Sequence, residues 1–287
     1  MQSKTTYFYP HKTLRLGDRL LDLSTPKVMG ILNITPDSFF DGGKYLTADD
    51  ALFRAEKMIN EGTDILDVGG MSSRPGAEII SEEEELKRII PVIKTITSKF
   101  DIPVSIDTIR GKVAYEAIQH GAVLVNDISA GKFDNTIINV CAKNKIPYAL
   151  MHMQGAPQNM QQTPVYNNVT EEVFQFMLDN CRNLTAKGIH EIIIDPGFGF
   201  GKTVEHNYEL VKNLEIFQQI GFPILAGISR KSMICKVLKV NPEKALNGTT
   251  ALHAILLLKG ANILRVHDVK EAIEVIQIVQ NLNIHLP

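Results

Sequence analysis

Polar and ionisable residues follow eight short apolar segments of this chain, each near the point where the segment ends. Together, Asp107, Asn126, Asp195 and Lys231 offer carboxylate acceptors, an amide and an ammonium donor. Such a set can hydrogen-bond a flat heterocycle that carries donors and acceptors along its edges. Burying these charges without partners would be costly, so their recurrence at segment ends indicates a binding site.

A second group of residues has the chemistry of an anion site, and it comprises Asn33, Arg74, Arg265 and His267. The guanidinium fork of arginine matches phosphate oxygens in two parallel hydrogen bonds. The amide oxygen of Asn33 can also bind magnesium, which keeps several waters and takes few protein ligands. The two groups therefore predict a heterocycle and a phosphate-bearing group in one site.

Other chemical motifs are weaker. The glycine-rich segment 197–203 lacks both the GxxxxGK[ST] and the GxGxxG spacing, so its glycines are interpreted as turn and close-approach positions. The chain contains no HExxH and no GxSxG sequence. His152 is interpreted as a structural histidine after a strand. Asp127 and Asp268 suit helix N-caps at strand–helix junctions.

The elements that must position these residues alternate regularly. The apolar segments, typical of parallel strands buried on both faces, span residues 28–34, 65–68, 104–106, 123–125, 148–151, 192–194, 224–228 and 263–266. The amphipathic stretches after them predict helices over 48–60, 82–98, 111–120, 136–144, 169–187, 205–219, 242–259 and 269–282. Eight such units predict an α/β fold of the (β/α)8 TIM-barrel type. A doubly wound sheet is the alternative, but its usual strand count is about five or six.

Length and composition agree with one domain over residues 1–287, in which residues 5–23 predict a β-hairpin within an extension over 1–26. A net charge of −2 gives no indication of nucleic acid as a partner. Cys141, Cys181 and Cys235 lack the spacing of a zinc site or disulfide framework, and no signal peptide or membrane span is evident. We therefore expect a cytoplasmic enzyme of small-molecule substrates.

Eight segments in family order carry a close resemblance to the dihydropteroate synthases, a family of pterin-binding TIM barrels. They are MGILNITPDSFFDGG (29–43), DVGGMSSRPGA (67–77), SIDT (105–108), VNDISA (125–130), MHMQG (151–155), DPGFGFGKT (195–203), GISRKS (227–232) and RVHDV (265–269). The resemblance implies a magnesium-dependent transferase of folate biosynthesis. It would condense 6-hydroxymethyl-7,8-dihydropterin pyrophosphate with p-aminobenzoate, giving 7,8-dihydropteroate and pyrophosphate by an SN1-like displacement.

The resemblance also implies roles for matching positions. The pterin-binding residues would be Asp107, Asn126, Met151, Asp195, Lys231 and Arg265. The pyrophosphate residues would be Asn33, Arg74, Arg265 and His267, with Asn33 also a ligand of Mg²⁺. The p-aminobenzoate pocket would comprise Phe39, Ser73, Pro75, Phe200, Lys231 and Ser232, where sulfonamides are expected to compete. The catalytic residues would be Asp41, Asp107, Lys231 and Arg265. A homodimer is also implied.

One segment departs from the family pattern. The second loop usually reads Glu-Ser-Thr-Arg-Pro-Gly, whereas this chain has Met71 and Ser73 in place of the glutamate and the threonine. Ser73 keeps the hydroxyl, so the change bears on loop anchoring and sulfonamide affinity rather than on the reaction. Two rivals are a corrinoid-linked methyltransferase and a non-catalytic pterin-binding paralogue. Neither needs the anion-site residues, and all four are present here.

Overall fold

Eight parallel strands form one sheet in the part of the chain that this computed structural model describes: residues 12–35, 48–71, 80–156, 160 and 164–282. The spatial order is β8-β7-β6-β5-β4-β3-β10-β9. A parallel bridge between Ile194 and Ile224 links the two outer strands, so the sheet curls into a barrel. The strands are β3 (Lys27–Asn33), β4 (Ile65–Gly69), β5 (Val104–Asp107), β6 (Leu124–Asp127), β7 (Tyr148–Met151), β8 (Ile192–Asp195), β9 (Leu225–Ala226) and β10 (Ile263–Val266).

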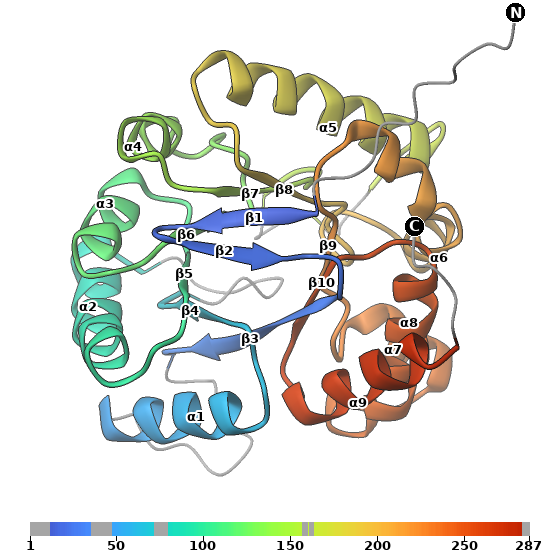
Figure 1. Cartoon of the computed structure of the whole chain (residues 1–287). Coiled ribbons are helices and arrows are strands. Elements are labelled where there is room, and N and C mark those ends of the chain that lie inside the picture. The colour runs from blue at the N-terminus through green and yellow to red at the C-terminus, as the bar shows by residue number, and fades with distance from the viewer. Residues whose placement is uncertain (1–11, 36–47, 72–79, 157–159, 161–163, 283–287) are drawn as a thin grey trace, which may run out of the picture.

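Helices surround this barrel, as the strand–helix alternation predicts (Figure 1). They are α1 (Ala48–Asn60), α2 (Glu82–Lys99), α3 (Gly111–Gln119), α4 (Thr136–Asn144), α5 (Val169–Ala186), α6 (Val204–Lys212), α7 (Ser232–Leu238), α8 (Leu246–Leu258) and α9 (Val269–Gln280), with 3-10 helices η1 (Leu214–Ile220) and η2 (Pro242–Lys244). The predicted (β/α)8 architecture is confirmed, and the doubly wound alternative is wrong.

Three helical predictions need correction. The helix predicted over 205–219 is divided at Asn213, where the backbone leaves helical geometry and the side chain donates to Thr170 Oγ1 at 3.1 Å. The helix predicted over 242–259 is divided at Ala245, because Pro242 opens a separate 3-10 turn. The short helix α7 was not predicted, since seven residues give too little periodicity to recognise.

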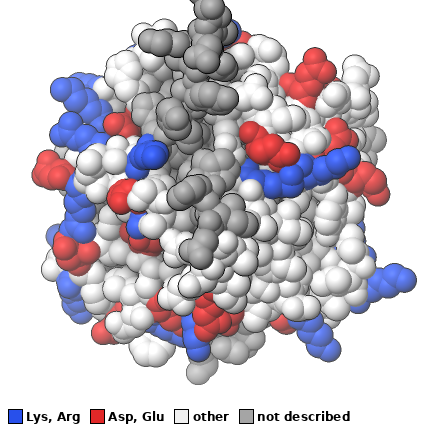
Figure 2. Space-filling model, turned by 45° about the vertical axis from the view of Figure 1, so that its right-hand side comes forward, with Lys and Arg blue, Asp and Glu red and all other residues white. Residues whose placement is uncertain are grey.

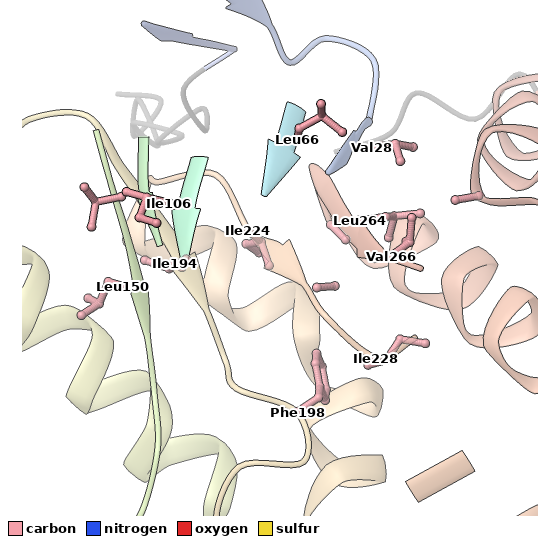
Figure 3. Packing of buried hydrophobic residues seen from close by; sticks show 14 of the residues in the cluster. Val28, Leu66, Ile106, Leu150, Ile194, Phe198, Ile224, Ile228, Leu264 and Val266 are labelled. Carbon is pink, nitrogen blue, oxygen red and sulfur yellow. The ribbon is translucent and has the colours of Figure 1, made fainter. Parts of the chain in front are cut away.

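The main core lies between the strands and the helices. Strand residues such as Val28, Leu264 and Val266 lie beside the helices that flank their strands (Figure 3). These side chains belong to one large buried apolar cluster. Because both faces of each strand are covered, the strands read as continuous apolar runs rather than as alternating sequences.

A β-hairpin covers the amino-terminal end of the barrel. Strand β1 (Thr13–Leu16) pairs antiparallel with β2 (Arg19–Asp22). Leu14 and Leu16 pack inside the barrel against a second apolar cluster, which includes Met29, Ile65, Leu124, Ala149, Ile193, Leu225 and Ile263. The predicted hairpin is confirmed from residue 12 onward, and residues 1–11 lie outside the described part. The single domain with an extension over 1–26 remains a prediction.

The described surface carries charges of both signs, and the three cysteines form no disulfide. Lys and Arg side chains are interspersed with Asp and Glu side chains on the face shown in Figure 2. Cys141 and Cys181 are buried and Cys235 is half-buried, and all three are free thiols. Within the described residues, every helix is too short or too polar to cross a membrane.

Candidate active site

The inner surface of the barrel changes from apolar to polar along the strands. The inward-facing apolar cluster fills the lower end, against the hairpin. Side chains of a strand alternate between its two faces, so the residue two positions further on also points inward. The residues reached in this way are Asp67, Asn126, Met151, Asp195 and Arg265. Strand alternation thus brings four predicted pterin residues, and Asp67, to one end of the barrel.

Arg265 joins two neighbouring strands through a pair of ionic hydrogen bonds. Its Nε donates to Oδ2 of Asp67 at 2.6 Å, and its Nη2 donates to Oδ2 of Asp107 at 2.6 Å. Asn126 Nδ2 donates to the same Asp67 oxygen at 2.9 Å. Asp67 is fully buried and therefore holds two predicted ligand-binding side chains in fixed positions. Sequence reasoning missed this role, although strand alternation from Ile65 could have found it.

The charges of this network perturb one another strongly. Burial raises the pKa of Asp107, the Arg265 guanidinium opposes that shift, and the nearby Asp67 adds to it. Burial disfavours the charged form of Arg265, but the carboxylates of Asp67 and Asp107 outweigh it and raise the Arg265 pKa. Arg265 is consequently a fixed cation at the barrel mouth.

Lys231 lies at the same end of the barrel, where a Cβ added at Gly227 would meet its Nζ and Asp195 Oδ2 at 3.9 Å each and Arg265 Cβ at 3.8 Å. Burial lowers the pKa of Lys231 to about 8, and the Asp195 carboxylate opposes the shift. Its Nζ donates to the backbone oxygen of Phe198 and lies 4.4 Å from the ring centroid of Phe200. A cation held over an aromatic face in a desolvated site is stabilised by the ring quadrupole. Lys231 therefore lies between the polar side chains at the end of the barrel and the aromatic ring of Phe200.

An apolar cluster stands beside these polar groups. It comprises Ile109, Ile128, Met151, Met153, Met160 and Phe200, and Met71 packs against it. Met71, which replaces the glutamate of the family pattern, thus extends this apolar cluster at the edge of the site instead of presenting a carboxylate. Because methionine is flexible and apolar, it suits packing against a planar ligand.

Two of the predicted anion residues lie at the carboxyl ends of their strands, Asn33 as the last residue of β3 and His267 directly after β10. Asn33, Gly69 and Asp107 occupy adjacent register positions on β3, β4 and β5, and a Cβ added at Gly69 would meet Asn33 Oδ1 at 3.5 Å. The His267 backbone N–H donates to Ser229 Oγ at 3.3 Å, and Ser232 is the first residue of α7.

Five predicted site residues are not part of this geometry. Phe39, Asp41, Ser73, Arg74 and Pro75 lie outside the described residues. The roles predicted for them stay predictions.

The donor chemistry at the rim is compatible with magnesium. Asn33 supplies a neutral amide oxygen of the kind that a hard cation accepts. Among the described residues, no group of three or more His, Cys, Asp or Glu side chains gathers as a closed metal cage. Magnesium suits such a site, since it often takes one or two protein ligands and completes its shell with water and phosphate oxygens.

Comparison with known proteins agrees with this geometry. The family model described as "Pterin binding enzyme" matches residues 29–267. A dihydropteroate synthase from Haemophilus influenzae is 45% identical over 269 residues, which cover 93% of this chain and 98% of the relative.

Two solved structures share the fold. The Yersinia pestis dihydropteroate synthase in a sulfonamide drug complex has a TM-score of 0.91 and 42% identity, covering 94% of this chain and 99% of its own. The Xanthomonas albilineans enzyme in complex with 7,8-dihydropteroate has a TM-score of 0.85 and 35% identity, covering 94% of this chain and 98% of its own. Sequence, coverage and fold agree that this chain belongs to the dihydropteroate synthase family of pterin-binding enzymes.

Proposed function

We propose that this enzyme condenses 6-hydroxymethyl-7,8-dihydropterin pyrophosphate with p-aminobenzoate, and that pyrophosphate leaves before the amine attacks. The observation that carries the proposal is the buried Asp67–Arg265–Asp107 network beside the neighbouring charged groups of Asp195 and Lys231. It combines acceptors and donors for a heterocycle with a fixed cation for an anionic leaving group. Family membership supplies the substrate class, since a relative is solved with 7,8-dihydropteroate.

The pterin is proposed to lie on the polar floor of the barrel. Asp107, Asn126 and Asp195 would bind the donor and acceptor edge of the ring, and Lys231 would donate to it. Met151 is buried at the end of β7, in register with Asp195, and would pack against one ring face. A preorganised set of this kind binds without reorganising its own hydrogen bonds.

The pyrophosphate is proposed to face Arg265, His267 and Asn33 at the rim, together with Arg74. When bound, Mg²⁺ held by Asn33 would neutralise charge on the departing phosphate oxygens. Arg265 would stabilise the same charge through a guanidinium that Asp67 and Asp107 already orient. The cost of ordering that side chain is therefore met before substrate binds.

The amine is proposed to lie between Phe200, Lys231 and Ser232, with Phe39, Ser73 and Pro75 completing the pocket. As the C–O bond breaks, pyrophosphate takes the electron pair and leaves a cation delocalised into the pterin. The buried carboxylates of Asp107 and Asp195 would stabilise that cation. The amine nitrogen then forms the C–N bond and gives up one proton. Such a route needs no covalent enzyme nucleophile.

A homodimer is proposed through the later helices. Val237 and Leu238 on α7, with Ile255 and Leu258 on α8, are exposed large apolar residues. Figure 2, which brings the α6–α9 side forward, shows a wide area without charged side chains. Exposed apolar area of this kind typically marks an association surface. Equilibrium sedimentation that gives a monomer at micromolar concentration would contradict this proposal.

The reaction itself is tested with purified protein, the pterin pyrophosphate, p-aminobenzoate and magnesium, each omitted in turn. We expect release of pyrophosphate together with 7,8-dihydropteroate, and loss of both when magnesium is chelated. Chromatography of the pterin products separates synthesis from simple hydrolysis. Tight pterin binding without product in the complete mixture would contradict the proposed function and favour a non-catalytic paralogue.

A further inference from the structure

Lys202 is a buried cation next to the proposed site, with 2% of its surface exposed. Its Nζ lies 3.0 Å from Nδ1 of His152, 2.9 Å from the backbone oxygen of Gly197 and 3.1 Å from that of Phe200. The His152 backbone oxygen lies 3.3 Å away. All of these groups can accept a hydrogen bond, and an ammonium can donate three. Lys202 thus ties the β8–α6 loop to the end of β7.

The loop directs its carbonyl groups to two different lysines. Gly197, Gly199 and Gly201 all have positive φ, with values of 72°, 81° and 61°, a conformation that glycine adopts without steric cost. The carbonyls of Gly197 and Phe200 face Lys202, whereas the Phe198 carbonyl accepts from Lys231. The loop therefore accepts hydrogen bonds from both Lys202 and Lys231 through its backbone carbonyls.

Close packing leaves this loop little freedom to shift. A Cβ at Gly197 would clash with the His152 backbone oxygen, and one at Gly201 would clash with the Gln154 backbone oxygen. A Cβ at Gly199 would meet Lys231 Cδ at 3.0 Å. The Gly197 N–H donates to Asp195 Oδ1 at 2.7 Å, so the same loop also orients a proposed pterin carboxylate.

We propose that Lys202 is a positioning residue that holds the β8–α6 loop, and through it Lys231, Phe200 and Asp195, in the geometry the reaction requires. The inference rests on the proposed function, because Lys231 and Phe200 matter only if they bind substrate. Lys202 touches none of the reacting atoms in this assignment. It acts through the carbonyls of Gly197 and Phe200.

Burying the Lys202 ammonium costs free energy, and packing alone does not explain why a lysine occupies this position. Burial lowers the pKa of Lys202, and the Asp195 carboxylate opposes that shift. An apolar side chain would fill the same space without desolvating an ammonium. What only the lysine supplies is three donors aimed at His152 and at two loop carbonyls.

The test compares Lys202→Met with Lys132→Met. Lys132 is the control, because it is another lysine near the end of β7 and donates to the Met153 backbone oxygen at 3.3 Å, yet it is exposed and contacts none of residues 197–201 in the described interactions. Initial rates are measured well below the unfolding temperature, with the pterin dissociation constant obtained separately by calorimetry. We expect Lys202→Met to raise KM for p-aminobenzoate and to lower kcat/KM by about tenfold to a hundredfold, since small misplacements are that costly. Lys132→Met should stay within about twofold of the parent.

A merely structural role would lower the unfolding temperature of Lys202→Met while leaving kcat and both substrate constants of the folded enzyme unchanged, and that result overturns the inference. If Lys202→Met does not fold, His152→Leu decides the matter, because it removes one Lys202 contact and keeps both loop carbonyls. His152→Leu should raise KM for p-aminobenzoate in the same direction, and an unchanged KM overturns the inference. Failure of the unmodified enzyme to form product would instead reject the proposed function.

Discussion

Arg265 on β10 reaches Asp67 on β4 across the intervening strand β3, and its Nε lies 2.6 Å from Asp67 Oδ2. The carboxylate is fully buried, so its charge has few alternatives to this partner. A pair like this fixes the guanidinium in one orientation, at the cost of making each partner depend on the other.

Asp67→Asn is expected to lower kcat/KM for the pterin pyrophosphate by about a hundredfold, because Arg265 loses one of two carboxylates that aim it. Stopped-flow measurement of pyrophosphate release reports the defect directly. Asp64→Asn is the control, since Asp64 pairs with Lys27 near the start of β3, away from the site. Equal losses in both variants would show a general effect on the barrel rather than a role in aiming Arg265.

Lys231 predicts an alkaline limit to activity. Its pKa is lowered to about 8, so the ammonium is present below that pH and is lost as pH rises through it. The kcat/KM for the pterin substrate should therefore fall above about pH 8. Lys231→Arg keeps the charge at all accessible pH values and should lose this limb, although at lower overall activity. Persistence of the limb in Lys231→Arg would assign it to another group.

Phe200 predicts a selective defect in amine binding. Phe200→Leu removes the aromatic face 4.4 Å from Lys231 Nζ, an interaction typically worth about 1–2 kcal/mol in a desolvated site. We expect KM for p-aminobenzoate to rise about tenfold while the pterin dissociation constant stays nearly constant. Phe174→Leu, which loses a ring contact with Phe217 in the helical layer, serves as the control. An equal rise in the pterin dissociation constant of Phe200→Leu would contradict a role of Phe200 specific to amine binding.

His253 on α8 predicts a pH-dependent stability. Its exposed fraction is 1%, and neither ring nitrogen finds a hydrogen-bond partner among the described residues. Burial lowers its pKa to about 4, with Asp268 opposing the shift. In the unfolded chain His253 binds a proton near pH 6.5, whereas in the folded chain it stays neutral down to about pH 4. The free energy of unfolding therefore falls as pH drops from about 6.5 toward 4.

His253→Leu removes that contribution. Between pH 7 and pH 5 the variant should lose about 2 kcal/mol less stability than the parent in urea titrations. His190→Gln, at an exposed histidine, should follow the parent at both pH values. A His253→Leu variant that loses as much stability as the parent would show that His253 is not the responsible group.

Sequence periodicity predicted several elements residue for residue, including short ones. Strand β7, helix α1 and helix α4 begin and end at the predicted residues. Boundaries failed where local chemistry breaks the period, as at Asn213 and Pro242. Residue types at the strand ends also indicated which side chains meet, because parallel strands carry their carboxyl ends to one edge.

The partners of those side chains were not predictable. Arg265 and Asp67 lie 198 positions apart, and nothing local in either segment indicates the other. Lys202 was recognised only as the end of a glycine-rich segment that lacks nucleotide-binding spacing. Its connection to His152 and to the carbonyls of Gly197 and Phe200 depends on how two loops pack, which periodicity does not encode.

The hairpin also has a bearing on the order of events. Leu14 and Leu16 fill the amino-terminal end of the barrel beneath Asp195 and Asn126. The site is therefore open only at the carboxyl ends of the strands. In a site with one opening, the ligand that binds deepest enters first and leaves last. A heterocycle seated against Asp195 and Asn126 would precede the amine, and the leaving anion, nearer the rim, could depart while the coupled product still waits below it.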